Sequence, residues 1–207
     1  MKVSDIPGII VERLPRYYRY FDKSVRNNVD YISSKEIGEE LGIHSTQVRK
    51  DFSYYGEFGK RGVGYETTFL RGQLEKILGL NYSWEIVLIG MGNLGEALVS
   101  YDGFKRLGLN IRYVFDVAPK LAESKLGDVE VYNIDNLDSI LKKNEIKIGI
   151  IATPAEAAQD IVDKLVVAGI KGIWNFAPTY LHTPEDVHVR NEDLATGLIS
   201  LSYHLSN

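Results

Sequence analysis

The stretch from Trp84 to Asp116 constrains the fold of this chain more than any other part of the sequence. An apolar run over residues 84–89 leads into the glycine-rich segment Gly90–Gly95, and a second apolar run over residues 111–115 ends at Asp116. Strand, glycine turn, helix, strand and acidic residue follow one another in this order in a dinucleotide-binding βαβ unit. The sequence therefore predicts a Rossmann fold that holds a nucleotide at the glycine turn.

Each glycine of this turn has a physical role in such a unit. Gly90 permits the tight turn, Gly92 lets the backbone approach a pyrophosphate, and Gly95 lets the helix pack closely on the strand. The free N–H groups and the positive end of the helix dipole favour phosphate binding there. Asp116 is expected to bind the ribose hydroxyls and to repel a 2′-phosphate, which favours NAD over NADP. The alternative is an empty Rossmann-like scaffold, because the glycine pattern alone is a weak signal.

The rest of the C-terminal half continues to alternate between strands and helices. Strands are expected over residues 129–132, 146–152 and 172–178, and helices over 137–143 and 155–167. This pattern predicts an α/β fold, a doubly wound parallel sheet with helices on both faces. Ligands of such sheets bind beyond the carboxyl ends of the strands. The candidate cofactor-binding residues at that edge are Gly90, Met91, Gly92, Asn93, Leu94, Gly95, Tyr101, Asp116, Thr153, Pro154, Asn175, Phe176 and Ala177.

Tyr101 is expected one to two turns into the helix that follows the glycine turn. From there its ring could reach a nicotinamide. The alternative is a partly buried core aromatic whose hydroxyl contacts water, which is the more common situation for tyrosine.

Two short helices are predicted in the N-terminal half. Ser33 and Glu36 have the spacing of a capping box at the start of the first helix, and Gly42 is a natural stop for it. A second helix is expected to start at Ser45 or Thr46 and to continue to residue 55. Two short helices joined by a glycine-containing turn form a helix-turn-helix.

The second of these helices has a divided surface. Val48, Phe52 and Tyr55 share one face and are expected in the core, whereas Asp51 is expected to point away from DNA. The candidate DNA-binding residues cluster near the N-terminal end, where a recognition helix meets DNA, and they are Ser45, Thr46, Gln47, Arg49 and Lys50. Glutamine and arginine can each make bidentate contacts to a base, and a lysine at position 50 is expected at a phosphate.

The glycine-rich segment over residues 56–65 follows directly. Four glycines, two adjacent cations and flanking aromatic residues predict a β-hairpin wing, with a flexible loop as the alternative. Lys60 and Arg61 at its tip are expected to enter a minor groove, where narrow A·T tracts deepen the negative potential. The N-terminal half is therefore predicted to be a winged helix-turn-helix domain.

Helices are also expected at the two ends of the chain. The first covers residues 6–21 and buries an apolar face, with Pro15 as a kink or as its true start. Arg13, Arg16 and Arg19 form a basic edge on it, either solvated or in contact with phosphates or the other domain. The last helix covers residues 191–206, and its leucine stripe is expected to cap its own subunit or to exchange with a neighbour.

Composition narrows the remaining possibilities. The chain has 207 residues and no cysteine, which excludes disulfides, thiolate metal sites and cysteine nucleophiles and fits a reducing compartment. We expect no metal site. Residues 1–5 lack the apolar core of a signal peptide, and no apolar run approaches the ~18–20 residues that span a bilayer. We therefore expect a cytoplasmic protein without membrane contact.

Four segments of the chain are together typical of one protein family. They are Gln47-Val48-Arg49-Lys50-Asp51, Gly59-Lys60-Arg61-Gly62-Val63-Gly64-Tyr65, Gly90-Met91-Gly92-Asn93-Leu94-Gly95 and Asn175-Phe176-Ala177-Pro178. They closely resemble the Rex family of redox-sensing transcriptional repressors, over essentially the whole chain. The resemblance implies a homodimer that binds a palindromic, A·T-flanked DNA operator when it is empty or holds NAD⁺, and that leaves the operator when NADH binds.

The resemblance also implies roles for three switch residues. Tyr101 matches a tyrosine near the nicotinamide, and Asp193 matches an acid on a C-terminal helix that is swapped between subunits. Arg19 matches an arginine of the DNA-binding domain that can pair with that acid. The expected domains are residues 1–80 for DNA binding, 81–190 for NAD(H) binding and 191–207 for the swapped helix.

Two other functions are compatible with a Rossmann domain. An NAD-dependent dehydrogenase needs a general acid or base beside the nicotinamide, and none of the four histidines lies in the predicted crevice. No part of the chain is left to form a substrate domain. A CoA-binding Rossmann module is the second alternative. We expect no enzymatic activity.

Overall fold

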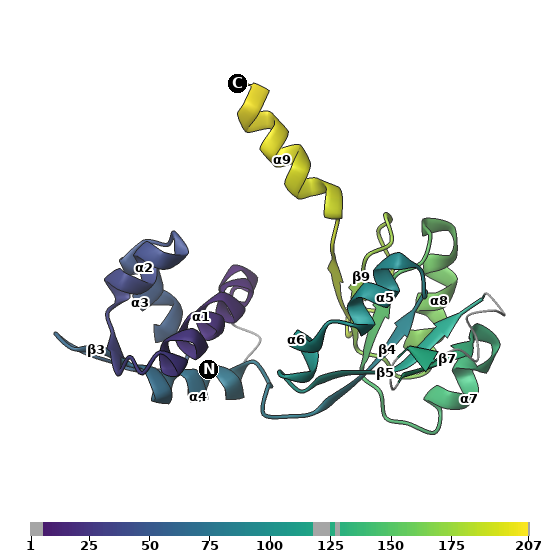
Figure 1. The fold of residues 1–207 in the computed structure, drawn as a ribbon, viewed down its shortest axis with the longest axis horizontal. Coiled ribbons are helices and arrows are strands. Elements are labelled where there is room, and N and C mark those ends of the chain that lie inside the picture. Colours follow the sequence, from purple (N-terminus) through teal and green to yellow (C-terminus); the bar gives the residue numbers. More distant parts are fainter. Residues whose placement is uncertain (1–5, 118–124, 127–128, 207) are drawn as a thin grey trace. The chain divides into compact units, whose positions relative to one another are not determined.

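The structure is a computed structural model that describes residues 6–117, 125–126 and 129–206. Residues 1–5, where no signal peptide is expected, lie outside the described residues. The chain divides into two compact units, Met1–Tyr82 and Ser83–Asn207 (Figure 1). Among the described helices, none combines the length and the apolar character that crossing a bilayer requires.

The N-terminal unit is a winged helix-turn-helix. Its elements are α1 (Gly8–Arg26), β1 (Tyr31–Ile32), α2 (Ser34–Leu41), α3 (Ser45–Ser53), β2 (Gly59–Lys60), β3 (Gly64–Glu66) and α4 (Thr67–Ile77). The strands form an antiparallel sheet in the order β1-β3-β2. The hairpin of β2 and β3 is the predicted wing, and α2 and α3 are the predicted helix pair.

Local sequence signals account for these boundaries. Ser33 Oγ accepts a hydrogen bond from Glu36 N at 3.2 Å, and Glu36 Oε2 accepts one from Ser33 N at 2.8 Å, which completes the capping box. Gly42 ends α2 in the left-handed region, with φ 66°. Gly64 also has positive φ, and a Cβ there would lie 2.5 Å from the carbonyl oxygen of Ile32. Only glycine fits at position 64, where strand β3 of the wing lies against β1.

Two expectations for this unit were wrong. Pro15 is not the start of α1, which runs from Gly8 to Arg26 with Pro15 inside it and Pro7 as its N-cap. Pro15 and Val11 are both exposed, so water can reach the carbonyl that the missing N–H leaves unpaired. The recognition helix α3 ends at Ser53, and Tyr55 beyond it is only half-buried.

An aromatic cluster centred on Phe52 forms the core of this unit. Its ring centroid lies 4.9 Å from that of Tyr17 on α1 and 5.0 Å from that of Tyr65 on β3. Phe21, also on α1, packs at 6.3 Å. Edge-on and tilted arrangements of this kind are the favoured geometry of aromatic pairs. The recognition helix is thus packed against both α1 and the wing.

The C-terminal unit is a doubly wound sheet, as predicted. Its elements are β4 (Trp84–Ile89), α5 (Asn93–Val99), α6 (Asp102–Lys105), β5 (Leu109–Asp116), β6 (Lys125–Leu126), β7 (Val129–Asn133), a 3₁₀ helix (Ile134–Asn136), α7 (Leu137–Leu141), β8 (Ile148–Ile151), α8 (Ala155–Val167), β9 (Gly172–Asn175), β10 (His188–Asn191) and α9 (Leu194–Ser206). The strand order is β10-β9-β8-β4-β5-β7-β6. All neighbours are parallel except β6 and β7.

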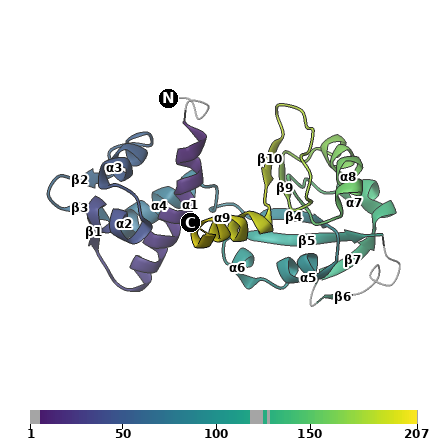
Figure 2. The same ribbon diagram turned by 90° about the horizontal axis from the view of Figure 1, so that it is seen from above.

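Alternate residues of the central strands feed two separate cores. Val87 and Ile89 of β4 belong to the cluster that α7 and α8 cover. Ile86 and Leu88 belong to the opposite cluster, against which Leu98 of α5 packs. Figure 2 shows α5 on one side of the sheet and α8 on the other. Helices therefore cover both faces, and the strand order reverses between β4 and β8.

The end of the chain differs from the prediction. Asn191 is the last residue of strand β10, which pairs with β9, and α9 begins only at Leu194. Strand β10 is an edge strand with little buried surface. Its sequence, His188-Val189-Arg190-Asn191, contains one apolar residue. Neither an apolar run nor an alternating pattern was available to reveal it.

Gly95 provides a test of the close packing between α5 and β4. A Cβ at Gly95 would lie 2.1 Å from the carbonyl oxygen of Gly90, whereas a Cβ at Gly92 would meet nothing within 4 Å. We expect Gly95→Ala to lower the melting temperature by several degrees, because overpacking against backbone costs about 1–3 kcal/mol. Thermal unfolding followed by circular dichroism measures this effect.

Gly92→Ala is the matched control and should leave the melting temperature close to that of the unmodified protein. A Gly95→Ala variant that melts at the same temperature as Gly92→Ala would show that the helix can move away from the strand at little cost.

Candidate functional site

The exposed side of α3 and the wing present the predicted cations. Thr46, Arg49 and Lys50 are exposed on α3, and Lys60 and Arg61 are exposed on the wing. A concavity of about 580 Å³ separates the two elements and is lined by residues from α3, from the wing and from the start of α2. This arrangement can hold a polyanionic backbone between the recognition helix and the wing.

Arg49 is tethered within this concavity. Its Nη1 donates to Ser34 Oγ at 2.8 Å, which places the guanidinium beside the first residue of α2. The other N–H groups of Arg49 remain available, because a guanidinium carries five donors. Ser45, another predicted DNA-binding residue, is half-buried at the start of α3.

Gln47 does not simply face outward, as the sequence suggested. It is half-buried, and its Nε2 donates to Asp51 Oδ1 at 2.6 Å. Asp51 points away from the exposed face, as expected, but it does so by being wholly buried. A buried carboxylate needs partners for its charge and for its lone pairs.

Helix α1 supplies those partners. Arg13 donates to Asp51 from Nε at 2.6 Å and from Nη2 at 2.7 Å, and Tyr17 Oη donates at 2.7 Å. Burial by itself would raise the pKa of Asp51, but the hydrogen bonds from Arg13, Tyr17 and Gln47 outweigh it and hold this pKa below its ordinary value. Burial and the neighbouring carboxylate raise the pKa of Tyr17, so its hydroxyl stays a donor.

Sequence reasoning missed this cluster, although a signal was present. Asp51 lies three residues after Val48 and next to Phe52, so helical spacing places it on the core face of α3. An acid at such a position requires a buried cation. The partners that could have been predicted for this acid are Arg13 and Tyr17, which lie four residues apart on α1.

The predicted basic edge of α1 therefore has three different environments. Arg13 binds Asp51, and Arg16 Nη2 donates to the carbonyl oxygen of Leu41 at 2.5 Å, at the end of α2. Both arginines hold the helix-turn-helix rather than face a phosphate. Arg19 is exposed, and within the described part of the chain it forms no hydrogen bond or ion pair.

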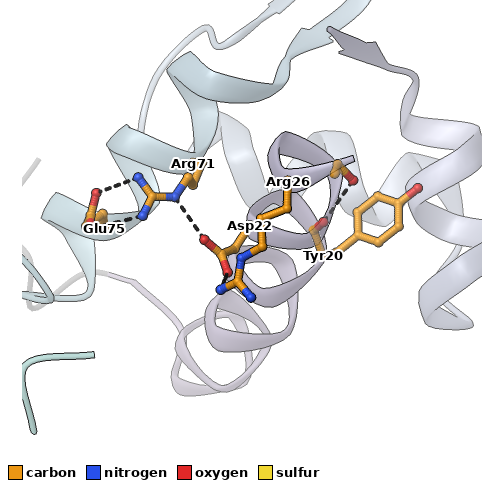
Figure 3. Close-up of polar contacts among 6 residues, drawn as sticks. Tyr20, Asp22, Arg26, Arg71 and Glu75 are labelled. Atoms are coloured by element: carbon orange, nitrogen blue, oxygen red, sulfur yellow. Dashed lines mark hydrogen bonds and ion pairs between the residues drawn. The ribbon is translucent and has the colours of Figure 1, made fainter. Parts of the chain in front are cut away.

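A second polar cluster joins α1 to α4. Asp22 accepts from Arg71 Nε at 3.1 Å and also pairs with Arg26, as Figure 3 shows. Arg71 in turn contacts Glu75 at 3.3 Å. These pairs are partly exposed and contribute little stability, but they fix how the two helices are oriented. Helix α1 thus contacts both α4 and α3 through side-chain ion pairs.

In the C-terminal unit the glycine turn lies where the strand order reverses. Gly90 has φ 101°, and a Cβ there would lie 2.4 Å from the carbonyl oxygen of Ala152, just past β8. The turn after β4 is thereby brought against Thr153. Asp116 at the end of β5 accepts a hydrogen bond from Met91 N at 2.7 Å. Four of the predicted cofactor-binding positions, Gly90, Met91, Asp116 and Thr153, therefore meet at the edge where such sheets bind ligands.

The residues at this edge differ in what they can offer a ligand. Gly92 opens onto free space, and Thr153 Oγ1 is buried with no hydrogen-bond partner in the described structure. A buried hydroxyl without a partner suits a site that a ligand completes. The Met91 side chain is buried in the core, and its N–H donates to Asp116. Asn93 and Leu94 begin α5, and Pro154 is the exposed N-cap of α8.

Asn175 was expected at the cofactor but stabilises its own loop. Its Nδ2 donates to Thr179 O at 2.9 Å and to Asn191 Oδ1 at 2.8 Å, and its Oδ1 accepts from Ala177 N at 3.0 Å. Asn175 and Ala177 are both buried. The amide of Asn175 therefore shapes the chain after β9, and Phe176 is the half-buried residue of this segment.

Tyr101 lies outside the helix in which it was expected. Helix α5 ends at Val99, and Tyr101 is the N-cap of α6 with 57% of its surface exposed. Its ring packs edge-on against Phe104, with 4.9 Å between centroids. Phe104 contacts Trp174, which contacts Phe176. A row of four aromatic rings therefore joins Tyr101 to the end of β9.

Asp193, the third predicted switch residue, lies just before α9. Asp193 Oδ1 accepts from Ala195 N at 2.8 Å in the first turn of the helix. None of the described residues of α9 is buried. The leucines at 194, 198, 201 and 205 are each more than half exposed. An apolar stripe of this kind is a surface that a partner normally covers.

Family models match both halves of the chain. A model described as "Putative DNA-binding protein N-terminus" matches residues 5–53. A model described as "CoA binding domain" matches residues 81–179. The first match lies within the first compact unit, and the second lies in the second unit apart from residues 81–82.

Curated relatives match almost the whole chain. "Redox-sensing transcriptional repressor Rex" of Clostridium botulinum (strain Alaska E43 / Type E3) is 44% identical over 99% of this chain and 97% of that protein. The protein of the same name from the Hall strain (ATCC 3502, Type A) is 45% identical over 97% of this chain and 96% of its own length.

Solved structures also match almost the whole chain. A crystal structure of RSP in complex with β-NAD⁺ and operator DNA has a TM-score of 0.92 at 40% identity, covering 97% of this chain and 93% of that one. RSP in complex with β-NADH has a TM-score of 0.90 at 39% identity, covering 98% and 95%. RSP itself is described as a Rex-family repressor. The predicted family is confirmed, and the chain belongs to the Rex family of redox-sensing transcriptional repressors.

Proposed function

We propose that this protein is a redox-sensing transcriptional repressor that binds a palindromic operator and is released from it by NADH. One observation carries the proposal. A relative that matches nearly the whole chain at 40% identity was crystallised with NAD⁺ and operator DNA, and the same relative was crystallised with NADH. The cationic face of α3 and the wing supplies the DNA contact, with Thr46, Arg49, Lys50, Lys60 and Arg61 as its residues.

NAD(H) is the ligand that the C-terminal unit fits. The open space at Gly92 leaves room for a pyrophosphate, and the unpartnered Thr153 Oγ1 provides a hydrogen-bonding group at the same edge. NAD⁺ and NADH differ by one positive charge on the nicotinamide ring. Burying that charge without a partner is costly, so a nicotinamide ring that packs on the aromatic row from Tyr101 to Phe176 favours the NADH form.

The functional protein is a homodimer with exchanged C-terminal helices. The leucine stripe on α9, in which each leucine is more than half exposed, supports this, since an apolar helix face is not stable in water. Asp193 at the start of α9 then pairs with Arg19 of the DNA-binding domain, which has no other partner in the described chain. NADH must favour the released state by about 5 kcal/mol to convert a mostly bound population into a mostly free one. A change in the spacing of the two recognition helices achieves the release.

We infer that this chain catalyses no reaction and works in the cytoplasm beside the DNA it binds. The curated relatives carry the name of repressors. Hydride transfer also needs a positioned acid or base, and the four histidines lie at the start of α3, after β9, in β10 and in α9. Steady loss of absorbance at 340 nm with any candidate substrate would contradict this inference.

CoA is the second candidate ligand, because the family model that matches residues 81–179 is described as a CoA binding domain. Titrating NADH and CoA while following tryptophan fluorescence distinguishes the two. Saturation by NADH with no response to CoA supports the redox sensor.

The function predicts opposite effects of the two coenzyme forms. In a gel-shift assay on an A·T-flanked palindrome, NADH should abolish the shifted band at concentrations at which NAD⁺ leaves it intact. NADPH serves as the control ligand and should not release the DNA, because Asp116 repels its 2′-phosphate. Release by both oxidation states, or by neither, would contradict the proposal.

The wing cations should bind phosphate or the minor groove electrostatically. We expect Lys60→Ala to weaken operator binding several-fold and to reduce the slope of log affinity against log salt by about 1. Lys142→Ala, at an exposed position after α7 in the other unit, is the matched control and should change neither value. Equal salt slopes for the two variants would remove Lys60 from the DNA interface.

Asp116 should determine the choice between NADH and NADPH. Asp116→Ala removes the charge that repels a 2′-phosphate, so the ratio of the two affinities should fall about ten-fold or more. NADH affinity should fall as well, because Asp116 also holds the N–H of Met91. Fluorescence titration with both coenzymes measures the ratio, with Asp138→Ala as a control at an exposed site on α7. An unchanged ratio would exclude the ribose contact.

A further inference from the structure

The carboxylate of Asp51 is fully occupied by side chains from two helices. It is buried, and it accepts two hydrogen bonds from Arg13, one from Tyr17 and one from Gln47, all between 2.6 and 2.7 Å. An ionised carboxyl has about four lone-pair sites, so none remains for water or DNA. Asp51 therefore has no direct part in DNA binding, although it lies within the recognition helix.

Gln47 is the partner of Asp51 that lies on the recognition helix itself. It is in the first turn of α3, one turn before Asp51, at the end of the helix that enters a major groove. Its Nε2 is bound to Asp51, while its Oε1 accepts no hydrogen bond from any residue that the structure describes. The amide is thus held with its acceptor oxygen unused.

Arg13 and Tyr17 already satisfy the charge and three of the lone pairs of Asp51. The bond to Gln47 adds order to a side chain that would otherwise rotate freely at a half-exposed position. Ordering a side chain before its ligand arrives reduces the entropy lost on binding. The contact between Gln47 and Asp51 is therefore one that can improve DNA recognition rather than only stabilise the domain.

We propose that Asp51 is a positioning residue for DNA recognition. It holds Gln47 so that Oε1 faces the major groove and accepts a hydrogen bond from the exocyclic amino group of adenine or cytosine. Arg13 and Tyr17 fix Asp51 itself, so helix α1 sets the orientation of a base-reading side chain on α3. The inference rests on the proposed function, because it requires that α3 reads an operator.

A double-mutant cycle on operator affinity tests this role. Gln47→Ala should weaken binding about ten-fold in the otherwise unmodified dimer, as expected for loss of one good base contact. In the Asp51→Asn background, where the amide of Gln47 is no longer held, the same change should cost about two-fold or less. Fluorescence anisotropy with labelled operator gives all four affinities, and circular dichroism confirms that each variant is folded.

The outcomes separate the inference from the proposed function. Failure of the unmodified protein to bind any A·T-flanked palindrome defeats the proposed function itself. If the protein binds the operator but Gln47→Ala weakens binding equally in both backgrounds, the proposed function stands and the positioning role is overturned. Asp51 would then be structural only. The base preference at the position that Gln47 contacts should also be lost in Asp51→Asn, whereas a uniform loss over all sequences contradicts the inference.

Gln47→Glu tests the contact if Asp51→Asn does not fold. It places a second carboxylate against Asp51 and should lower the melting temperature by more than Gln47→Ala does. Equal melting temperatures for these two variants would show that the side chain at position 47 does not contact Asp51, and would overturn the inference.

Discussion

The buried ion pair between Arg13 and Asp51 is the interaction on which the DNA-reading half of the molecule depends. It joins the recognition helix to α1 at a point where Arg13 is 16% exposed and Asp51 is wholly buried. Removing one partner of such a pair leaves an uncompensated buried charge, at a cost of roughly 3–5 kcal/mol. The aromatic cluster around Phe52 packs beside this pair, so charge and apolar packing together fix α3.

Helix α1 is the common support of the N-terminal unit. Its first half holds α3 through Asp51 and α2 through Arg16, and its second half holds α4 through Asp22. The same helix carries Arg19, the exposed arginine that we propose as a switch residue. A contact that displaces Arg19 therefore also displaces α1, the helix that positions the recognition helix. This connection gives the proposed release of DNA a physical route within one domain.

In the C-terminal unit, backbone crowding rather than charge determines the site. The carbonyl oxygens of Ala152 and Gly90 lie where Cβ atoms of residues 90 and 95 would be, so only glycine permits the turn to lie against β8 and α5. Asp116 completes the turn by binding Met91 N. Ligand groups can then approach the backbone at Gly92, where no side chain intervenes.

The sequence allowed a good prediction of the fold wherever a local pattern reports burial. The capping box at Ser33, the apolar strand from Trp84 and the helix Ala155–Val167 all follow from such patterns, and each is present in the structure. Strand β10 was missed because an exposed edge strand has no apolar signature.

The site was harder to predict because long-range pairing does not appear in local patterns. Asn175 looks like a ligand-binding residue in the sequence, yet its amide binds the loop after β9. The contact that holds the amide of Gln47 to Asp51 was equally invisible in the sequence. Tyr101 was placed within a helix because its spacing from the glycine turn fits one. Helix α5 ends at Val99, so Tyr101 lies beyond its end and its predicted place inside the helix was wrong.

The central claim is that operator occupancy follows the ratio of NADH to NAD⁺, since both forms compete for one nucleotide site. The most direct measurement is operator anisotropy during NADH titration at several fixed NAD⁺ concentrations. The NADH concentration at half-release should rise in proportion to NAD⁺ once NAD⁺ saturates the site. Half-release at one NADH concentration, whatever the NAD⁺ concentration, would contradict competition for one site.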